Sequence, residues 1–393
     1  MTAVDLAFQW GMSPVFGWGV YGLHLARHGL RDDRALGCLC ACDSGLLSQE
    51  GEAPAQVLAT GQAWLAGRPE GEDIRLDDAV VLHALGNDLK PAALAAHQGL
   101  VWGRRTFGVV FCEDSRITAA GRQRAARYDG LIAGSQWAGD VLRRGGLGRV
   151  PVRVVLQGVD GARFRPEARG GMFKGRFAVF SGGKLEYRKG QDTVLRGFAR
   201  FHRRHPEALL VTAWQSPWGA ALAQTFQGRE GYGPPQMRAN GLVDVPGWAA
   251  QFGLPPSAVL DLGIIPNAYM PLVLREVEAA LFPNRCEGGT NLVAMEAMAC
   301  GLPVVLSANS GHLDIIGAGH CYPLRRQGPV PGALAAGLEG WGESDEEEIA
   351  AALEEIYRDR ATAAVRGAAA ARFMAGFSWR RSIAALLDMV EAR

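Results

Sequence analysis

Residues 278–307, EAALFPNRCEGGTNLVAMEAMACGLPVVLS, carry the strongest structural signal in this 393-residue chain. An apolar strand ends at Pro283, and a loop with two glycines follows it. We expect a helix to begin near Thr290 or Asn291, because both side chains are suitable N-caps. Gly301 suits the position just after the end of that helix, and a second apolar strand follows. This alternation of buried strand, loop and helix predicts an α/β fold with a parallel sheet.

Similar apolar segments of strand length occur elsewhere in the chain, with helical segments between them. They are residues 4–9, 36–41, 79–83, 107–112, 130–133 and 152–156, then 177–181, 208–213, 260–264, 278–282 and 303–306. Between the two groups, residues 161–176 are rich in Gly, Pro and Arg and lack apolar periodicity, which predicts a linker. We therefore predict two Rossmann-like domains, at 1–165 and 177–375, and a C-terminal helix within 376–393.

The charge balance and hydropathy of the chain argue against several classes of protein. The net charge is +1 and no long basic run occurs, so we do not expect nucleic acid as a partner. The N-terminus lacks the features of a signal peptide, and no apolar run reaches the roughly 18 residues of a membrane span, so we expect a cytoplasmic protein. Cys38, Cys40 and Cys42 alternate along one predicted strand without C-x-x-C spacing, so we expect reduced thiols and no metal site.

The glycine loop has the physical chemistry of an anion site. Gly288 and Gly289 lead into a helix N-terminus, where several backbone N–H groups lack intrahelical partners and the helix dipole is positive. A diphosphate suits such a site. Glu287 precedes the glycines, and Glu296 lies inside the helix among apolar residues, where a carboxylate requires hydrogen-bonding partners. Sugar and ribose hydroxyls would supply them; capping of a loop or pairing with an arginine is the alternative.

The same stretch resembles the donor-site motif of glycosyltransferase family four, in which two glutamates are separated by seven residues. The match is closest over 296–305, EAMACGLPVV. The resemblance implies that Glu296 binds the ribose hydroxyls, and that Glu287 contacts the donor sugar and stabilises charge at its anomeric carbon. It also implies that the donor sugar and diphosphate meet the loop at Gly288, Gly289, Thr290, Asn291 and Leu292. Eight residues separate Glu287 from Glu296 here, and a one-residue bulge beside the glycines would restore the position of Glu287.

A second segment, residues 181–192 (SGGKLEYRKGQD), resembles the family's G-R-x4-K-G-x-D motif. Lys184 and Lys189 occupy its two basic positions, which implies that both clamp the donor diphosphate and stabilise the leaving group. They are two of only four lysines in the chain. Solvated loop lysines are the alternative interpretation. We expect Asp192 to cap the following helix rather than to contact a ligand.

The resemblance covers nearly the whole chain, because residues 129–137, 157–160 and 164–166 also match the family pattern that closes the N-terminal domain. It implies the GT-B architecture, in which two Rossmann-like domains face each other across a cleft. In that architecture the C-terminal helix crosses back to pack on the N-terminal domain.

Three candidate residues lie in the predicted N-terminal domain. Gly17 belongs to a glycine-rich loop that, in the resembling family, lies near the donor phosphates; close helix–strand packing is the alternative. His83 and Glu113 follow apolar strands, at the ends where open α/β sheets bind ligands, so we expect them on the acceptor or sugar side. A structural histidine is the alternative for His83.

Together these features predict a retaining glycosyltransferase of polysaccharide or glycoconjugate biosynthesis. It would move a hexose-type sugar from a nucleoside-diphosphate donor to a hydroxyl acceptor. No D-x-D motif occurs, so we expect metal-independent transfer without a cofactor. UDP and GDP donors are not distinguished, and the acceptor is a saccharide, a lipid-linked saccharide or a protein, which leaves peripheral membrane association open. A non-catalytic nucleotide-sugar-binding subunit is one alternative. A dinucleotide-dependent oxidoreductase is another, disfavoured because the glycine pattern at Gly17, Gly19 and Gly22 is by itself weak evidence and close helix–strand packing also explains it.

Overall fold

A computed structural model describes residues 4–68, 71–91, 99–223, 225–226, 232–330 and 337–392. The chain forms two compact units. Unit 1 consists of Met1–Gly158, Ala336–Glu339 and Phe377–Arg393, and unit 2 of Val159–Ala335 and Gly340–Gly376. The division falls after Gly158, so residues 161–176, which the sequence predicts as a linker, belong to unit 2.

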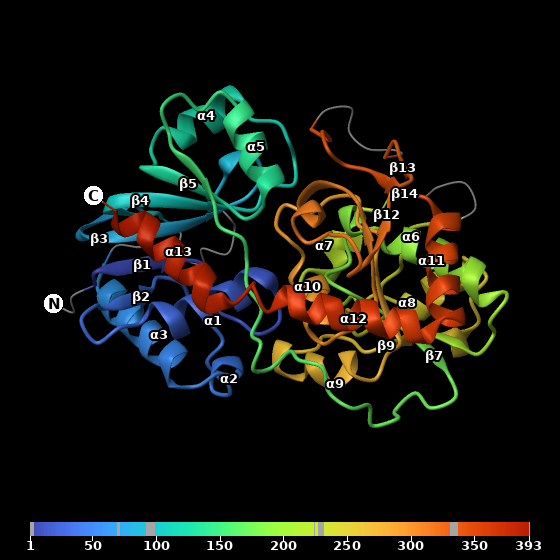
Figure 1. The fold of residues 1–393 in the computed structure, drawn as a ribbon. Helices are drawn as coiled ribbons and strands as arrows, with labels where there is room; N and C mark the ends of the chain where they lie inside the picture. The colour runs from blue at the N-terminus through green and yellow to red at the C-terminus, as the bar shows by residue number, and fades with distance from the viewer. Residues whose placement is uncertain are drawn as a thin grey trace. The chain divides into compact units, whose positions relative to one another are not determined.

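Unit 1 contains a six-stranded parallel sheet with the order β2-β1-β3-β4-β5-β6 (Figure 1). Its strands are β1 (Leu6–Gln9), β2 (Leu36–Cys38), β3 (Ile74–Leu85), β4 (Val101–Val110), β5 (Gly130–Ala133) and β6 (Val152–Val154). Its helices are α1 (Gly17–Gly29), α2 (Ser44–Leu47), α3 (Glu52–Leu65), η1 (Asn87–Leu89), α4 (Ala119–Ala125), α5 (Gln136–Arg144) and α13 (Trp379–Glu391).

The C-terminal helix α13 is part of unit 1 and packs against α1. The Trp379 ring stacks on that of His24, with centroids 4.7 Å apart, and the Ser382 hydroxyl donates to the Leu156 carbonyl at 2.6 Å. Ser378 caps the helix by accepting from the Arg381 N–H. The last helix of the chain therefore completes the core of unit 1.

Unit 2 contains a second six-stranded parallel sheet, with the order β12-β11-β10-β7-β8-β9. Its strands are β7 (Phe177–Gly182), β8 (Ala208–Ala213), β9 (Val259–Asp261), β10 (Ala279–Phe282), β11 (Val304–Ser307) and β12 (Tyr322–Leu324), with a small antiparallel pair of β13 (Gln327–Gly328) and β14 (Glu343–Ser344). Its helices are η2 (Tyr187–Lys189), α6 (Gln191–His202), α7 (Gly219–Ala223), α8 (Val245–Ala250), η3 (Pro256–Ala258), η4 (Asn267–Tyr269), α9 (Met270–Leu274), α10 (Leu292–Ala299), η5 (Ser310–Asp314), α11 (Glu346–Arg358) and α12 (Arg360–Met374).

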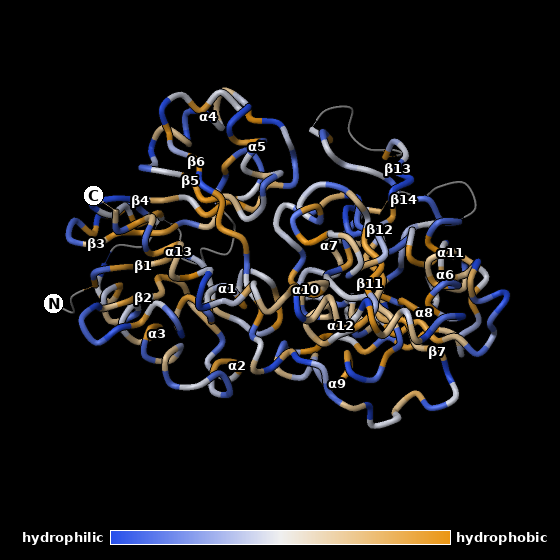
Figure 2. The backbone as a smooth tube through the Cα atoms, in the orientation of Figure 1, coloured by the Kyte–Doolittle hydropathy of each residue, from blue (hydrophilic) through white to orange (hydrophobic). Residues whose placement is uncertain are grey.

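The apolar composition of the strands explains both sheets. Hydrophobic segments coincide with the strands in each unit, and the strongly polar segments lie in loops and on outer helix faces (Figure 2). Strands β7, β8, β10 and β11 are buried along their whole length. Continuous burial requires helices on both faces of a parallel sheet. The α/β class and the two parallel sheets predicted from the sequence are confirmed.

Two predictions about strands differ from the structure. Strand β3 continues to Leu85, because it pairs with β4 up to Val110, so His83 lies within the strand and not at its end. Strand β2 ends at Cys38, so the three cysteines do not alternate along one strand.

Among the described residues, no helix has both the length and the hydropathy of a membrane span.

The third difference concerns Asp192. It lies inside α6, where Gly190 is the N-cap residue, so its predicted capping role is wrong. By contrast, α10 begins after Asn291 as predicted, and Gly301 adopts a positive φ of 79° just after the helix end.

Candidate functional site

The N-terminus of α10 is held by a chain of buried hydrogen bonds. Asn291 adopts a left-handed conformation with φ of 64°, and its Oδ1 accepts from the Ala294 N–H at 3.4 Å. Its amide nitrogen lies 3.0 Å from His312 Nε2, and His312 Nδ1 lies 3.1 Å from the Ser307 carbonyl oxygen. Burial lowers the pKa of His312 to about 4, so the ring is neutral and accepts at Nε2 while donating at Nδ1. The position of Asn291 therefore depends on His312.

The loop before α10 presents a row of backbone donors. Within the described part of the chain, no acceptor pairs with the backbone N–H groups of Gly289, Thr290, Asn291, Leu292 and Val293. Unpaired N–H groups at a helix N-terminus attract anions, because the helix dipole adds to their partial positive charges. The predicted diphosphate-binding segment thus has the donors that such a ligand requires.

A neighbouring segment, residues 309–312, contacts the loop through hydrogen bonds and close backbone packing. The Glu287 N–H donates to the Ser310 hydroxyl at 2.8 Å, and the Gly311 N–H donates to the Glu287 carbonyl at 3.1 Å. A Cβ on Gly311 would lie 1.7 Å from the Gly289 carbonyl oxygen and 2.8 Å from that of Glu287. The two backbones are therefore in contact, and only glycine fits.

Replacing Gly311 by alanine is expected to distort this loop. The clashing atoms are backbone atoms, so no side-chain rotation can relieve the overlap. We expect the free energy of unfolding to fall by about 1–3 kcal/mol, as in other overpacked sites. Gly161→Ala is the matched control in unit 2, since nothing lies within 4 Å of a Cβ there. Thermal unfolding measures both variants, and equal stability of G311A and the parent would contradict the close approach.

Glu287 is buried and fully paired. Its side chain is 5% exposed, so it is not a solvated loop carboxylate. Lys189 Nζ lies 2.5 Å from Oε1, Arg188 Nη1 lies 3.2 Å from Oε2, and the amide of Asn284 also donates to Oε1. Burial alone raises the pKa of Glu287, but the charges of Lys189 and Arg188 outweigh burial and bring it to about 2. The carboxylate is therefore ionised at neutral pH.

The turn that carries the two predicted lysines is braced by Gln191. Its amide nitrogen donates to the Lys184 carbonyl at 2.9 Å. The Lys184 side chain is 36% exposed and lies 3.2 Å from Glu186 Oε2, whereas the Lys189 side chain is 12% exposed and pairs with Glu287. The structure thus brings Lys189 and Glu287 together and leaves Lys184 near the surface of the same turn.

Glu296 is buried to a similar degree as Glu287, but its hydrogen-bonding partner is neutral. It is 5% exposed, and Asn267 Nδ2 donates to its Oε1 at 2.5 Å. Arg163 Nη1 lies 3.4 Å from Asn267 Oδ1. Burial raises the pKa of Glu296 to about 8, so the side chain is protonated at neutral pH in this state. Neither Asn267 nor Arg163 was predicted from the sequence, because no local pattern marks either residue.

The N-terminal candidates lie in unit 1. Gly17 is the first residue of α1, and the Glu113 N–H donates to Asn87 Oδ1 at 2.6 Å. His83 is 1% exposed, with Nδ1 3.0 Å from the Tyr128 hydroxyl and Nε2 2.9 Å from the Val101 carbonyl. Burial lowers the pKa of His83 to about 4. The contacts of His83 thus indicate a structural role, and its predicted ligand contact has no support in them.

A family model and two solved structures relate the chain to known proteins. A model described as "Family 4 Glycosyltransferase in conflict systems" matches residues 270–386. HepE of Anabaena, solved with UDP and glucose, is 14% identical, with a TM-score of 0.67 over 100% of both chains. Sucrose-phosphate synthase of Thermosynechococcus elongatus is 16% identical, with a TM-score of 0.63 over 98% of both chains. Both structures share the fold of this chain.

A curated relative resembles the chain over most of its length. The D-inositol 3-phosphate glycosyltransferase of Salinispora arenicola is 27% identical over 382 residues, which cover 92% of this chain and 75% of the relative. The similarity therefore spans both units and includes the segments of the candidate site.

Proposed function

We propose that this chain, a glycosyltransferase of family four with the GT-B fold, moves a hexose-type sugar from a nucleoside-diphosphate donor to a hydroxyl acceptor with retention of anomeric configuration. One observation carries the proposal. A row of backbone donors at the α10 N-terminus lies in the same loop as Glu287, which is ion-paired to Lys189. The backbone N–H groups and the Lys189 cation can bind a diphosphate. The Glu287 carboxylate can stabilise the positive charge that develops on the anomeric carbon of the sugar.

In this proposal the diphosphate binds the N–H groups of 289–293, and Lys189 offsets the negative charge that develops on the leaving group. Lys189 and the neighbouring Arg188 supply the positive charge that a metal ion supplies elsewhere, so we propose metal-independent transfer. The Glu296 carboxylate accepts hydrogen bonds from the ribose hydroxyls. Each role uses a group whose chemistry matches the part of the donor that it meets.

The partners of Glu287 favour a role in charge stabilisation over a role as nucleophile, since its oxygens already accept from Lys189, Arg188 and Asn284. We therefore propose a front-face reaction. The bond from the anomeric carbon to the phosphate oxygen breaks, and the acceptor oxygen bonds to that carbon on the same face. The acceptor's proton passes to the departing phosphate.

A donor screen tests this proposal. We expect UDP- or GDP-sugars to stabilise the protein by about 2.7 kcal/mol at 100 times their Kd, measured by thermal shift. UDP-glucose should be tried first, given the UDP and glucose bound to HepE. D-inositol 3-phosphate belongs among the first acceptors, given the name of the curated relative. NMR of the product then reports its anomeric configuration.

The outcomes of the screen separate the alternatives. Donor binding without hydrolysis or transfer would identify a non-catalytic binding subunit. Binding of a nicotinamide dinucleotide in place of every sugar nucleotide would favour an oxidoreductase.

The raised pKa of Glu296 makes nucleotide affinity depend on pH. Ribose hydroxyls donate to the ionised carboxylate, so below its pKa of about 8 binding must first release a proton. We expect affinity for UDP or GDP to rise by up to about tenfold per pH unit between pH 6.5 and 8, and then to level off. Calorimetry in buffers of different ionisation enthalpy detects the released proton.

Glu296→Gln is the matched variant for this pH dependence. Glutamine cannot titrate, so the affinity of E296Q should lack the rise that ends near pH 8. The unliganded parent should also lose stability as pH rises from about 4.3 to 8, because the carboxyl ionises first in the unfolded chain. E296Q should lack that loss too. A parent affinity that is constant over this range would refute the assignment of Glu296.

A further inference from the structure

We propose that Arg285 is a positioning residue for the transfer reaction. Its side chain holds segment 284–287 against segment 187–192, so that Glu287 and Lys189 meet in one fixed orientation. The inference rests on the proposed function, because it assigns to Arg285 an effect on the same donor site.

Arg285 is buried to an unusual degree for an arginine. Its side chain is 0% exposed, and its two terminal nitrogens bind the Asp192 carboxylate at 2.8 and 2.7 Å. Nε donates to Glu343, and Nη1 donates to the Tyr187 carbonyl at 2.6 Å. The guanidinium also lies 3.9 Å from the centre of the Tyr187 ring. A buried charge requires this degree of pairing, and a planar guanidinium with five donors can provide it.

The anchors of Arg285 come from three elements of unit 2. Tyr187 belongs to η2, Asp192 to the first turn of α6, and Glu343 to β14. Lys189 is the last residue of η2, and Glu287 follows Arg285 by two residues. The Arg285 side chain thus links the segment that carries Lys189 to the segment that carries Glu287.

Backbone contacts transmit this anchoring to the pair. The N–H groups of Arg285 and Cys286 both donate to the Arg188 carbonyl, at 2.7 and 3.2 Å. Gly190 has a φ of 68°, and a Cβ on it would lie 2.4 Å from the Pro283 carbonyl. The two segments are therefore in backbone contact, and a shift of one would displace the other.

Apart from Lys189, the groups that we propose to bind the nucleotide are held by different residues. Glu296 is bound by Asn267, and the α10 N-terminus by Asn291 and His312. None of the described contacts of Arg285 is with these residues. A positioning role therefore predicts that loss of Arg285 impairs turnover more than nucleotide binding.

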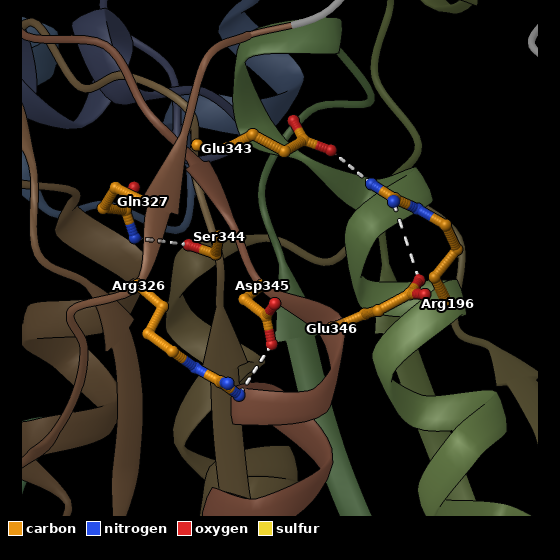
Figure 3. Close-up of a pocket in the computed structure, with 8 residues that line it drawn as sticks. Arg196, Arg326, Gln327, Glu343, Ser344, Asp345 and Glu346 are labelled. Atoms are coloured by element: carbon orange, nitrogen blue, oxygen red, sulfur yellow. Dashed lines mark hydrogen bonds and ion pairs between the residues drawn. The ribbon is translucent and has the colours of Figure 1, made fainter.

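Glu343 pairs with the buried Arg285 and is also reached from the surface, so a substitution of Glu343 can test the contacts of Arg285 while Arg285 itself is kept. It lines a surface pocket, where Arg196 bonds to both Glu343 and Glu346 (Figure 3). The same carboxylate binds Arg285 on its inner side. Glu343→Gln thus weakens the contacts that hold Arg285 without leaving its guanidinium unpaired, because the pairing with Asp192 remains.

Arg285→Lys is the direct test. Lysine keeps the charge but cannot bind two carboxylates and a carbonyl in one plane. We expect kcat at pH 7 to fall between about tenfold and 100-fold, as for small misplacements of reacting groups, and the affinity for UDP or GDP to fall by much less than the roughly tenfold expected when the Lys189 ammonium is removed. The acid limb of the kcat–pH profile should move to higher pH. A loosened Lys189 no longer holds the pKa of Glu287 near 2.

Val194→Ala is the matched control for stability. Val194 is a buried core residue of α6, the helix that carries Asp192, and its truncation should lower the Tm without moving the acid limb or kcat. If R285K does not fold, E343Q replaces it, with Arg196→Gln as the control, which removes the Arg196 contacts to Glu343, Glu346 and Thr193 but leaves the Glu343–Arg285 contact in place.

The outcomes distinguish the inference from the proposed function. A parent protein that binds no sugar nucleotide would refute the proposed function. A parent that turns over, together with an R285K or E343Q variant that keeps parental kcat, would overturn the inference alone. Equal losses of affinity and kcat, with an unmoved acid limb, would show that Arg285 only stabilises the fold.

Discussion

Glu287→Gln is expected to lower kcat by about 100-fold or more, a size typical for the loss of one preorganised electrostatic group. Glutamine keeps the shape of the side chain and can still accept from Lys189. It lacks the negative charge that opposes positive charge on the anomeric carbon. Affinity for free UDP or GDP should change by less than about twofold, because Glu287 meets the sugar and not the nucleotide. Initial rates and calorimetry measure the two quantities.

Glu207→Gln is a suitable control, since Glu207 lies in the same unit and its carboxylate pairs with the Tyr357 hydroxyl. Its kcat should equal that of the parent. Turnover of E287Q within about twofold of the parent, equivalent to about 0.4 kcal/mol in the barrier, would instead assign Glu287 a structural role.

Lys189→Met should weaken the binding of free diphosphate by about tenfold or more, as expected for one hydrogen bond to a charged group. It should also lower turnover, because Glu287 then keeps only Arg188 as a cationic partner in a buried site. Lys184→Met should have a smaller effect of about twofold to fivefold, since Lys184 is half-exposed and paired with Glu186. Calorimetry with UDP and GDP compares the variants.

Lys174→Met is the control for the loss of a lysine, because Lys174 is exposed in the same unit. Its diphosphate affinity should match that of the parent. Parental affinity in both K189M and K184M would refute the proposed diphosphate clamp.

Local interactions explain what could be predicted from the sequence. Apolar segments predicted the strands, and the N-cap residue Asn291 and the terminal Gly301 predicted the limits of α10. These features depend on residues within one turn or one strand of each other. The sequence motif also placed Glu287, Glu296, Lys184 and Lys189 in candidate roles, but it could not provide their partners.

Strand order determined those partners. Strands β7 and β10 are parallel neighbours, although about 100 residues separate them. The loops after parallel neighbours leave the same edge of a sheet, so Lys189 meets Glu287 and Asp192 meets Arg285. A sequence pattern with a range of a few residues contains no information about such pairs.

Burial was likewise decided by tertiary structure. The run that ends at His83 appeared to end a strand, but pairing with β4 extends the strand to Leu85 and encloses the imidazole. The two glutamates of the motif have the same intrinsic acidity and similar exposure. Their pKa values nevertheless differ, at about 2 for Glu287 and about 8 for Glu296, because two cations pair with the first and a neutral amide with the second. The sequence by itself thus determined the strands, the limits of α10 and the motif that names four candidate residues. Tertiary contacts determined the partners and charge states of those residues, because a pKa depends on every charge and dipole that the fold brings near the group.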